Sequence, residues 1–213
     1  MPKKVGPMRQ PLFSGKISGP LVVDSSVIIN LNATGRASDI VRAFGVTLCA
    51  STVVRDELQI DRFNGRDDGR LARALVYERL LEFVPFDDDG EFIFASLVTG
   101  SADQTLDDGE AATLALGATH GRTVVIDERK ALRIAADRFA AMQVIATADI
   151  LCSDLVLAAF GRQQVADLVF NGLTGARMGI PERHHDFVAE LLGPRIAECR
   201  SLPASLRQVA DSE

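Results

Sequence analysis

Residues 21–31 read Leu-Val-Val-Asp-Ser-Ser-Val-Ile-Ile-Asn-Leu, and this stretch decides the fold that the sequence predicts. Three branched apolar residues stop at a carboxylate, Asp24, and a second apolar run begins three residues later. This pattern is typical of a buried strand that ends at Asp24 and is followed at once by a helix. Residues 124–127 (Val-Val-Ile-Asp) repeat the pattern, so that two strands are each expected to end at an aspartate.

Short apolar runs alternate with helical patterns through the middle of the chain. The expected strands cover residues 21–24, 46–50, 82–86, 123–126 and 142–145. The strand that contains Pro85 is expected at a sheet edge, where proline is tolerated. This alternation predicts an α/β fold, a three-layer α/β/α sandwich with a central, mainly parallel five-stranded sheet.

Helical patterns fill the segments between these strands. The expected helices cover residues 25–31, 39–44, 52–60, 70–81, 91–99, 111–119, 128–138, 148–160, 162–170 and 181–192. Ser51 is the expected cap of the third helix, because its hydroxyl can accept a hydrogen bond from a first-turn amide. Residues 87–90 (Asp-Asp-Asp-Gly) are interpreted as a turn, and the final twenty residues as loosely held.

These patterns divide the chain of 213 residues into three parts. Residues 1–20 are expected to be a flexible N-terminal arm, residues 21–160 the α/β domain, and residues 161–213 a C-terminal helical extension. A hydrophobic share of 47% and a charged share of 24% are those of a globular protein with a substantial core. No apolar run approaches the roughly 20 residues that span a bilayer.

The cysteines, the N-terminus and the net charge indicate where the protein is located and which kinds of binding are disfavoured. Cys49, Cys152 and Cys199 lack metal-type spacing and are interpreted as reduced thiols, and no secretory signal follows the basic N-terminus, so a cytoplasmic location is expected. The net charge of −6 argues against indiscriminate nucleic-acid binding. The central residues 21–150 hold 13 basic and 21 acidic side chains, as a metal-binding core would.

Each candidate acidic residue has a structural explanation on its own. Asp24 and Asp127 could be helix N-caps, worth about 1 kcal/mol each. Asp107 and Glu110 have the spacing of a capping box, and Glu57 could be a solvated helix residue.

Taken together, the four carboxylates Asp24, Glu57, Glu110 and Asp127 favour a site. They follow strands, or begin helices, that meet at the carboxyl edge of such a sheet. Carboxylates that are close together repel one another unless protons or a cation neutralise them. All-oxygen ligands suit Mg²⁺ or Mn²⁺, and such an ion supports phosphodiester hydrolysis.

The acidic stretches resemble the four motifs of the PIN-domain nucleases. The resemblance rests on residues 22–28, 54–58, 106–112 and 125–128, together with the strand-to-helix turn at 144–151, and it covers about residues 21–160. It is closest to a prokaryotic, toxin-like branch whose third motif reads Gly-Glu. Many relatives in that branch are the toxin half of toxin–antitoxin pairs and cut RNA with Mg²⁺ or Mn²⁺.

The resemblance implies roles for particular residues. Asp24, Glu57, Glu110 and Asp127 would be the catalytic, metal-binding carboxylates of a metal-dependent endoribonuclease, and Ser26 the hydroxyl that holds Asp24 or a metal-bound water. RNA would be the substrate, an antitoxin protein a partner, and a homodimer a further assembly, with no membrane contact.

Two rows of basic side chains could contact RNA phosphates, although a solvated helix face would look the same. The rows are Arg62, Arg66, Arg70 and Arg73, and Arg129, Lys130, Arg133 and Arg138. His120, His184 and His185 lack metal-ligand spacing with any cysteine.

Two classes of protein other than a nuclease could also have this pattern of strands and acidic residues. The fold could serve as a catalytically inactive PIN module in protein or nucleic-acid binding, with its acidic residues as caps. A phosphate-transfer receiver domain also clusters acids at strand ends, but it needs an acid pair at the first strand. Asp24 is followed by Ser25, so the receiver domain is disfavoured.

Overall fold

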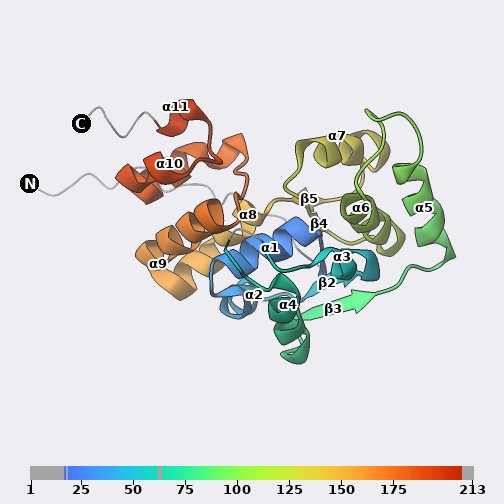
Figure 1. The fold of residues 1–213 in the computed structure, drawn as a ribbon, viewed down its shortest axis with the longest axis horizontal. Helices are drawn as coiled ribbons and strands as arrows, with labels where there is room; N and C mark the ends of the chain where they lie inside the picture. The colour runs from blue at the N-terminus through green and yellow to red at the C-terminus, as the bar shows by residue number, and fades with distance from the viewer. Residues whose placement is uncertain (1–16, 18, 62–63, 208–213) are drawn as a thin grey trace, which may run out of the picture.

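The computed structural model describes residues 17, 19–61 and 64–207, and its five strands form one sheet (Figure 1). The strands are β1 (Leu21–Val23), β2 (Leu48–Ser51), β3 (Leu81–Val84), β4 (Val124–Val125) and β5 (Val144–Ile145). Their order is β3-β2-β1-β4-β5, and every neighbouring pair is parallel. The predicted three-layer α/β/α sandwich is confirmed, with β3, the strand that precedes Pro85, at the expected edge.

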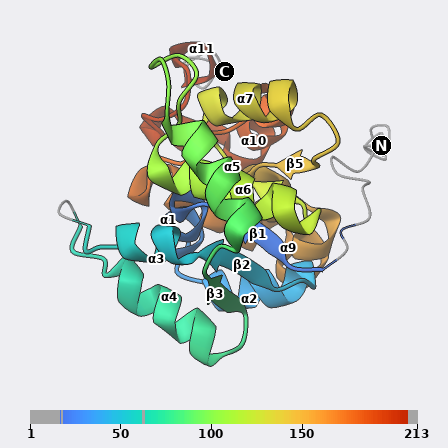
Figure 2. The same ribbon diagram turned by 90° about the vertical axis from the view of Figure 1, so that its right-hand side faces the viewer.

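Helices cover both faces of the sheet. One face carries α5 (Asp88–Val98), α6 (Asp108–His120) and α7 (Arg129–Arg138), which lie in front of the strands in Figure 2. The other face carries α1 (Ser25–Ala33), α2 (Ala37–Phe44), α8 (Thr147–Leu151), α9 (Asp154–Gly175) and α10 (His185–Leu192). The remaining elements are α3 (Thr52–Glu57), α4 (Asp68–Tyr77), α11 (Ala204–Arg207) and the 3₁₀ helices η1 (Glu182–His184) and η2 (Gly193–Glu198).

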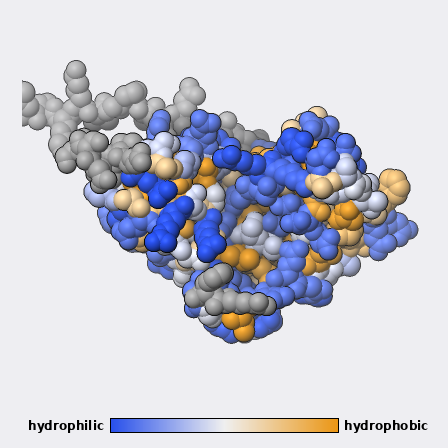
Figure 3. Space-filling view, turned by 45° about the horizontal axis from the view of Figure 1, so that its top comes forward, coloured by the Kyte–Doolittle hydropathy of each residue, from blue (hydrophilic) through white to orange (hydrophobic). Residues whose placement is uncertain are grey.

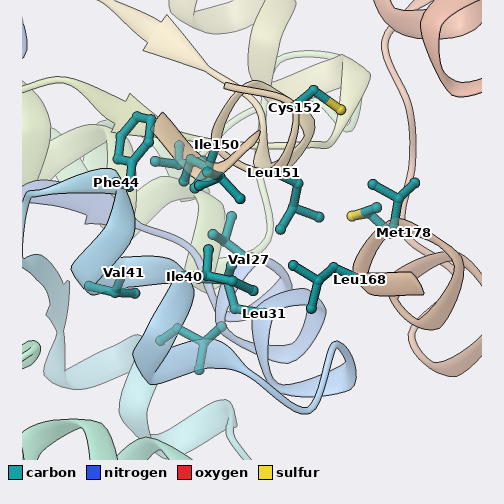
Figure 4. Packing of buried hydrophobic residues seen from close by; sticks show 14 of the residues in the cluster. Val27, Leu31, Ile40, Val41, Phe44, Ile150, Leu151, Cys152, Leu168 and Met178 are labelled. Carbon is teal, nitrogen blue, oxygen red and sulfur yellow. The ribbon is translucent and has the colours of Figure 1, made fainter. Parts of the chain in front are cut away.

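The alternation of side chains along β1 explains the two cores. Leu21 and Val23 face the core beneath α1 and α9, whereas Val22 faces the core beneath α6. Successive side chains of a strand point to opposite faces, so an uninterrupted apolar run is buried on both sides. Figure 4 shows part of the larger core, where Val27 of α1 lies near Leu151 and Leu168.

Several predicted boundaries are wrong for local reasons. Residues 87–90 are not a free turn: Asp87 caps α5, and its Oδ1 accepts a hydrogen bond of 2.8 Å from the Gly90 amide. The expected helix at 148–160 is divided between α8 and α9. The expected interruption at Gly161 is confirmed, because this residue has non-helical backbone angles (φ 75°, ψ 159°) and divides α9 by a kink. The helix capped by Ser51 is confirmed, but it ends at Glu57.

The expectation of a loosely held C-terminus is wrong for the described part. Ile196, Cys199 and Leu202 are all buried, because η2 and the segment after it pack beside α9 and α10. Most of the predicted arm at 1–20, and residues 208–213, lie outside the described residues. The three cysteines are buried and form no disulfide bond. Among the described helices, none combines the length and the apolar character that a membrane span needs.

Candidate active site

The carboxyl ends of β1 and β4 create the site. The chain leaves β1 through α1 on one face and leaves β4 through α7 on the other, so a crevice is expected between the two strand ends. The register pairs Val22 with Val124 and Val23 with Val125, which brings Asp24 and Asp127 to the same edge. Helices α3 and α6 contact each other above this edge and supply Glu57 and Glu110.

Asp24 is the central carboxylate. It is only 4% exposed, and its Oδ2 accepts hydrogen bonds from the Ser26 hydroxyl at 2.7 Å and the Ser26 amide at 3.2 Å. Asp24 is therefore the N-cap of α1, and the bond expected from Ser26 is present. Its Oδ1 is buried without a hydrogen-bond partner among the described residues. An unpaired buried carboxylate oxygen is costly, so this atom needs an explanation.

Glu57 approaches Asp24 across the backbone of Gly109. A Cβ placed on Gly109 would lie 2.8 Å from Glu57 Oε1 and 2.9 Å from Asp24 Oδ1, closer than real side chains come. Glu57 accepts hydrogen bonds from the Ser25 hydroxyl and the Gly109 amide. Glu57 is exposed, yet desolvation by the atoms around its carboxylate, together with the nearby charge of Asp24, raises the pKa of Glu57 above its usual range. Only glycine leaves room for both carboxylates at this point.

Glu110 lies in the first turn of α6, and its pKa is strongly raised. Burial, together with the charges of Glu128, Asp24 and Asp107, raises the pKa of Glu110 from 4.5 to about 7. Its carboxylate accepts a hydrogen bond from the Asp107 amide, whereas the Asp107 side chain makes no cap bond. The expected capping box is thus only half formed.

Asp127 is the most firmly held of the four. Its Oδ1 accepts a 2.8 Å bond from the Thr147 amide, and its Oδ2 accepts from the Thr147 hydroxyl at 2.6 Å and Asn30 Nδ2 at 2.8 Å. Burial raises the pKa of Asp127, although these bonds act in the opposite direction. The interpretation of Asp127 as a helix cap is wrong, because Glu128 caps α7 instead.

The donor set suits a hard cation, but it is not drawn together around one point. The negative charge of Asp24 raises the pKa of Glu57, Glu110 and Asp127, so all three lie within its electrostatic reach. Carboxylate oxygens are the ligands that Mg²⁺ and Mn²⁺ prefer. Within the part of the chain that the structure describes, no three Asp, Glu, His or Cys side chains converge closely enough to hold a metal ion. Binding an ion through three of these carboxylates would require them to move closer together.

Comparison with known families bears on this arrangement. A family model described as DUF3368, a PIN domain, matches residues 20–167, which is more than half of the chain. The chain belongs to the PIN domain family. PIN domains have a nuclease fold that acts on nucleic acid and generally uses divalent metal ions. The comparison with curated proteins gave no match, and neither did the comparison with solved structures.

Two polar residues in this PIN domain were not predicted from the sequence as part of the site. Asn30 and Thr147 provide all three of the hydrogen bonds given above for Asp127. Asn30 is buried within the apolar run of α1, and a buried amide in such a run is a usable signal, because buried polar groups need partners. Thr147 lies two residues after the end of β5, as Asp127 lies two residues after the end of β4, which is a second signal.

Several arginines of the two basic rows form hydrogen bonds within the protein. Arg66 donates to Asp68 Oδ1 at 2.8 Å and to the Gly175 carbonyl at 3.0 Å, so it has a structural role. Arg133 donates to the Asp103 carbonyl at 2.7 Å, and Arg138 donates to the Ser96 carbonyl at 3.0 Å. Arg62 lies outside the described residues.

Proposed function

We propose that this PIN domain is a divalent-metal-dependent endoribonuclease that hydrolyses RNA phosphodiesters with Mg²⁺ or Mn²⁺. One observation carries the proposal: Asp24 Oδ1 is buried without a partner, beside Glu57 and within the electrostatic reach of Glu110 and Asp127. A bound cation would satisfy this oxygen and offset the surrounding negative charge.

The four carboxylates Asp24, Glu57, Glu110 and Asp127 would hold the ion. Such an ion generates hydroxide from water near neutral pH and stabilises the charge that develops on a phosphodiester. Asn30 and Thr147 orient Asp127, as partners outside a metal's ligands commonly do. Glu110, with a pKa of about 7, would release its proton when a cation binds, because a metal ligand must be deprotonated.

The biological role that we propose is the toxin of a toxin–antitoxin pair. Support comes from the resemblance of the four acidic motifs to the toxin-like branch with a Gly-Glu third motif. The partner would be a small antitoxin protein, with a homodimer as a further assembly, in the cytoplasm. The face of the molecule drawn in Figure 3 is mainly hydrophilic, with smaller hydrophobic patches.

Cleavage of a mixed RNA pool tests the activity. Wild type with Mn²⁺ is expected to cut the RNA. Asp24→Asn is expected to cut it at least about 100-fold more slowly, because the central charge is lost. Asp56→Asn is the matched control: Asp56 precedes Glu57 but is exposed and paired with Arg55. Sequencing the cut ends would give the sequence preference.

Two results would contradict the proposal. Full activity of a folded Asp24→Asn variant would remove the catalytic assignment. Absence of Mn²⁺-dependent cleavage by wild type, with RNA still bound, would favour the inactive binding module.

A further inference from the structure

Asp149 lies at the centre of a buried polar cluster that the proposed chemistry does not use. It is 3% exposed in α8, and its Oδ2 accepts a 2.7 Å bond from the Ala146 amide, which caps the helix. Its other partners come from η1: His184 Nε2 lies 2.7 Å from Oδ1, and the Arg183 guanidinium binds both carboxylate oxygens. Burial alone would raise the pKa of Asp149, but these donors hold it at about 2.

The same turn reaches the candidate active site. Ala146 donates its amide to Asp149, and the next residue, Thr147, donates its amide and its hydroxyl to Asp127. A continuous series of contacts therefore runs from η1 through Asp149 and the turn to Asp127.

Both η1 donors come from beyond the matched PIN residues, in a segment that is firmly packed. His184 is completely buried, and the neighbouring helix α10 buries Phe187, Val188 and Leu192 against the larger core. Met178, on the chain that leads to η1, faces Leu168 of α9 (Figure 4). The cluster is therefore held from both sides, by α8 and by the C-terminal segment.

We propose that the C-terminal segment, residues 176–207, completes the active site: Arg183 and His184, acting through Asp149, hold the 146–149 turn so that Thr147 fixes Asp127. Arg183, His184 and Asp149 are positioning residues that contact no substrate. The catalytic consequence rests on the proposed function, whereas the structural coupling between η1 and Thr147 does not.

Hydrogen exchange of the Thr147 amide tests the coupling without reference to activity. In Arg183→Gln, this amide is expected to exchange about tenfold or more faster than in wild type, because its bond to Asp127 opens more often. Arg183 is 49% exposed at its side chain, so this variant is expected to fold. Arg195→Gln is the matched control: it breaks an exposed ion pair between the same segment and Asp167 of α9, involves neither Asp149 nor the 146–149 turn, and should leave the exchange unchanged.

A double-mutant cycle tests the catalytic consequence. Asp149→Asn and Thr147→Val are each expected to lower kcat about tenfold, with KM for RNA unchanged. The double variant should be slower than Thr147→Val alone by clearly less than tenfold, because valine has already removed the hydroxyl bond and only the amide bond from residue 147 to Asp127 is left for Asp149→Asn to loosen. Additive losses, or unchanged Thr147 exchange in folded Arg183→Gln, would overturn the proposal. An inactive wild type with faster exchange in Arg183→Gln would contradict only the ribonuclease function.

Discussion

The acidic side chains of the site tolerate one another by different means. Asp127 accepts three hydrogen bonds, and Glu57 accepts bonds from Ser25 and Gly109. Glu110 instead keeps its proton to a higher pH, since its pKa is about 7. When carboxylates lie close together, their mutual repulsion favours the protonated, neutral form of at least one of them. The metal-free site is therefore stabilised in part by a proton on Glu110.

This proton makes stability depend on pH. A carboxyl whose pKa is raised in the folded state favours folding below its ordinary pKa, and this contribution is lost as pH rises to the folded value. For Glu110, the loss falls between pH 4.5 and about 7. With a chelator present, Glu110→Gln should exceed wild type in unfolding free energy by about 1 to 2 kcal/mol at pH 8, allowing for the screening of a half-buried group.

Urea unfolding of both proteins from pH 4 to pH 8 measures the difference. The advantage of Glu110→Gln should disappear below about pH 4.5. A difference that is the same at every pH would show that Glu110 ionises normally.

The positions of Asp24 and Asp127 after their strands, and the bond from Ser26 to Asp24, could be predicted from the sequence, but the donors to Asp127 were not. Asp24 and Asp127 each end an apolar run, which is a local pattern. The bond from Asn30 to Asp127 joins residues 97 positions apart, and local spacing carries no information about such a contact. The unpaired Oδ1 of Asp24 also depends on the packing of α3 and α6, which only the folded chain determines.

Among the elements, the first turn of α6 brings the acidic residues together. Gly109 lies between Glu57 and Asp24, and the next residue is Glu110. The helix packs its small residues against the sheet, which allows this close approach: residues 111–117 are all buried. The predicted helix and its tight packing are confirmed, whereas the reason for glycine at position 109 requires the structure.

Gly109→Ala should separate function from stability. The added methyl group would displace the Glu57 carboxylate, which is the flexible end of its side chain, and would also crowd Asp24 Oδ1, so both carboxylates must shift while the backbone keeps its place. Alanine also favours the helix, and the unfolding free energy should stay within about 1 kcal/mol of wild type. Mn²⁺-dependent RNA cleavage should fall about tenfold or more, because Glu57 is moved from the site.

Gly179→Ala is the control for this prediction, since a Cβ at Gly179 would meet nothing within 4 Å. It should match wild type in both stability and cleavage. Wild-type activity in Gly109→Ala would show that the position of Glu57 does not matter.

The overall topology followed from the sequence because each strand is a short apolar run with a helix behind it. Five runs alternating with helices allow few arrangements other than a parallel sheet covered on both faces. The C-terminal part was less predictable. The helix expected at 162–170 follows the kink at Gly161 as predicted, but it continues to Gly175. The helix expected at 181–192 is a 3₁₀ turn followed by α10, which begins only at His185. The burial of Ile196 and Leu202 depends on contacts with distant elements.

The central claim is that carboxylates distant in the sequence together bind a divalent cation. Thermal unfolding at pH 8 tests it most directly, with and without Mn²⁺ and with Ca²⁺ for comparison. A ligand that binds only the folded protein raises its stability. Mn²⁺ should raise the unfolding midpoint of wild type and of Asp56→Asn, and it should raise the midpoint of Asp24→Asn much less. Metal-free Asp24→Asn should be at least as stable as wild type, because a repelling charge is removed. An equal Mn²⁺ effect on wild type and Asp24→Asn, or no effect on wild type, would contradict the account.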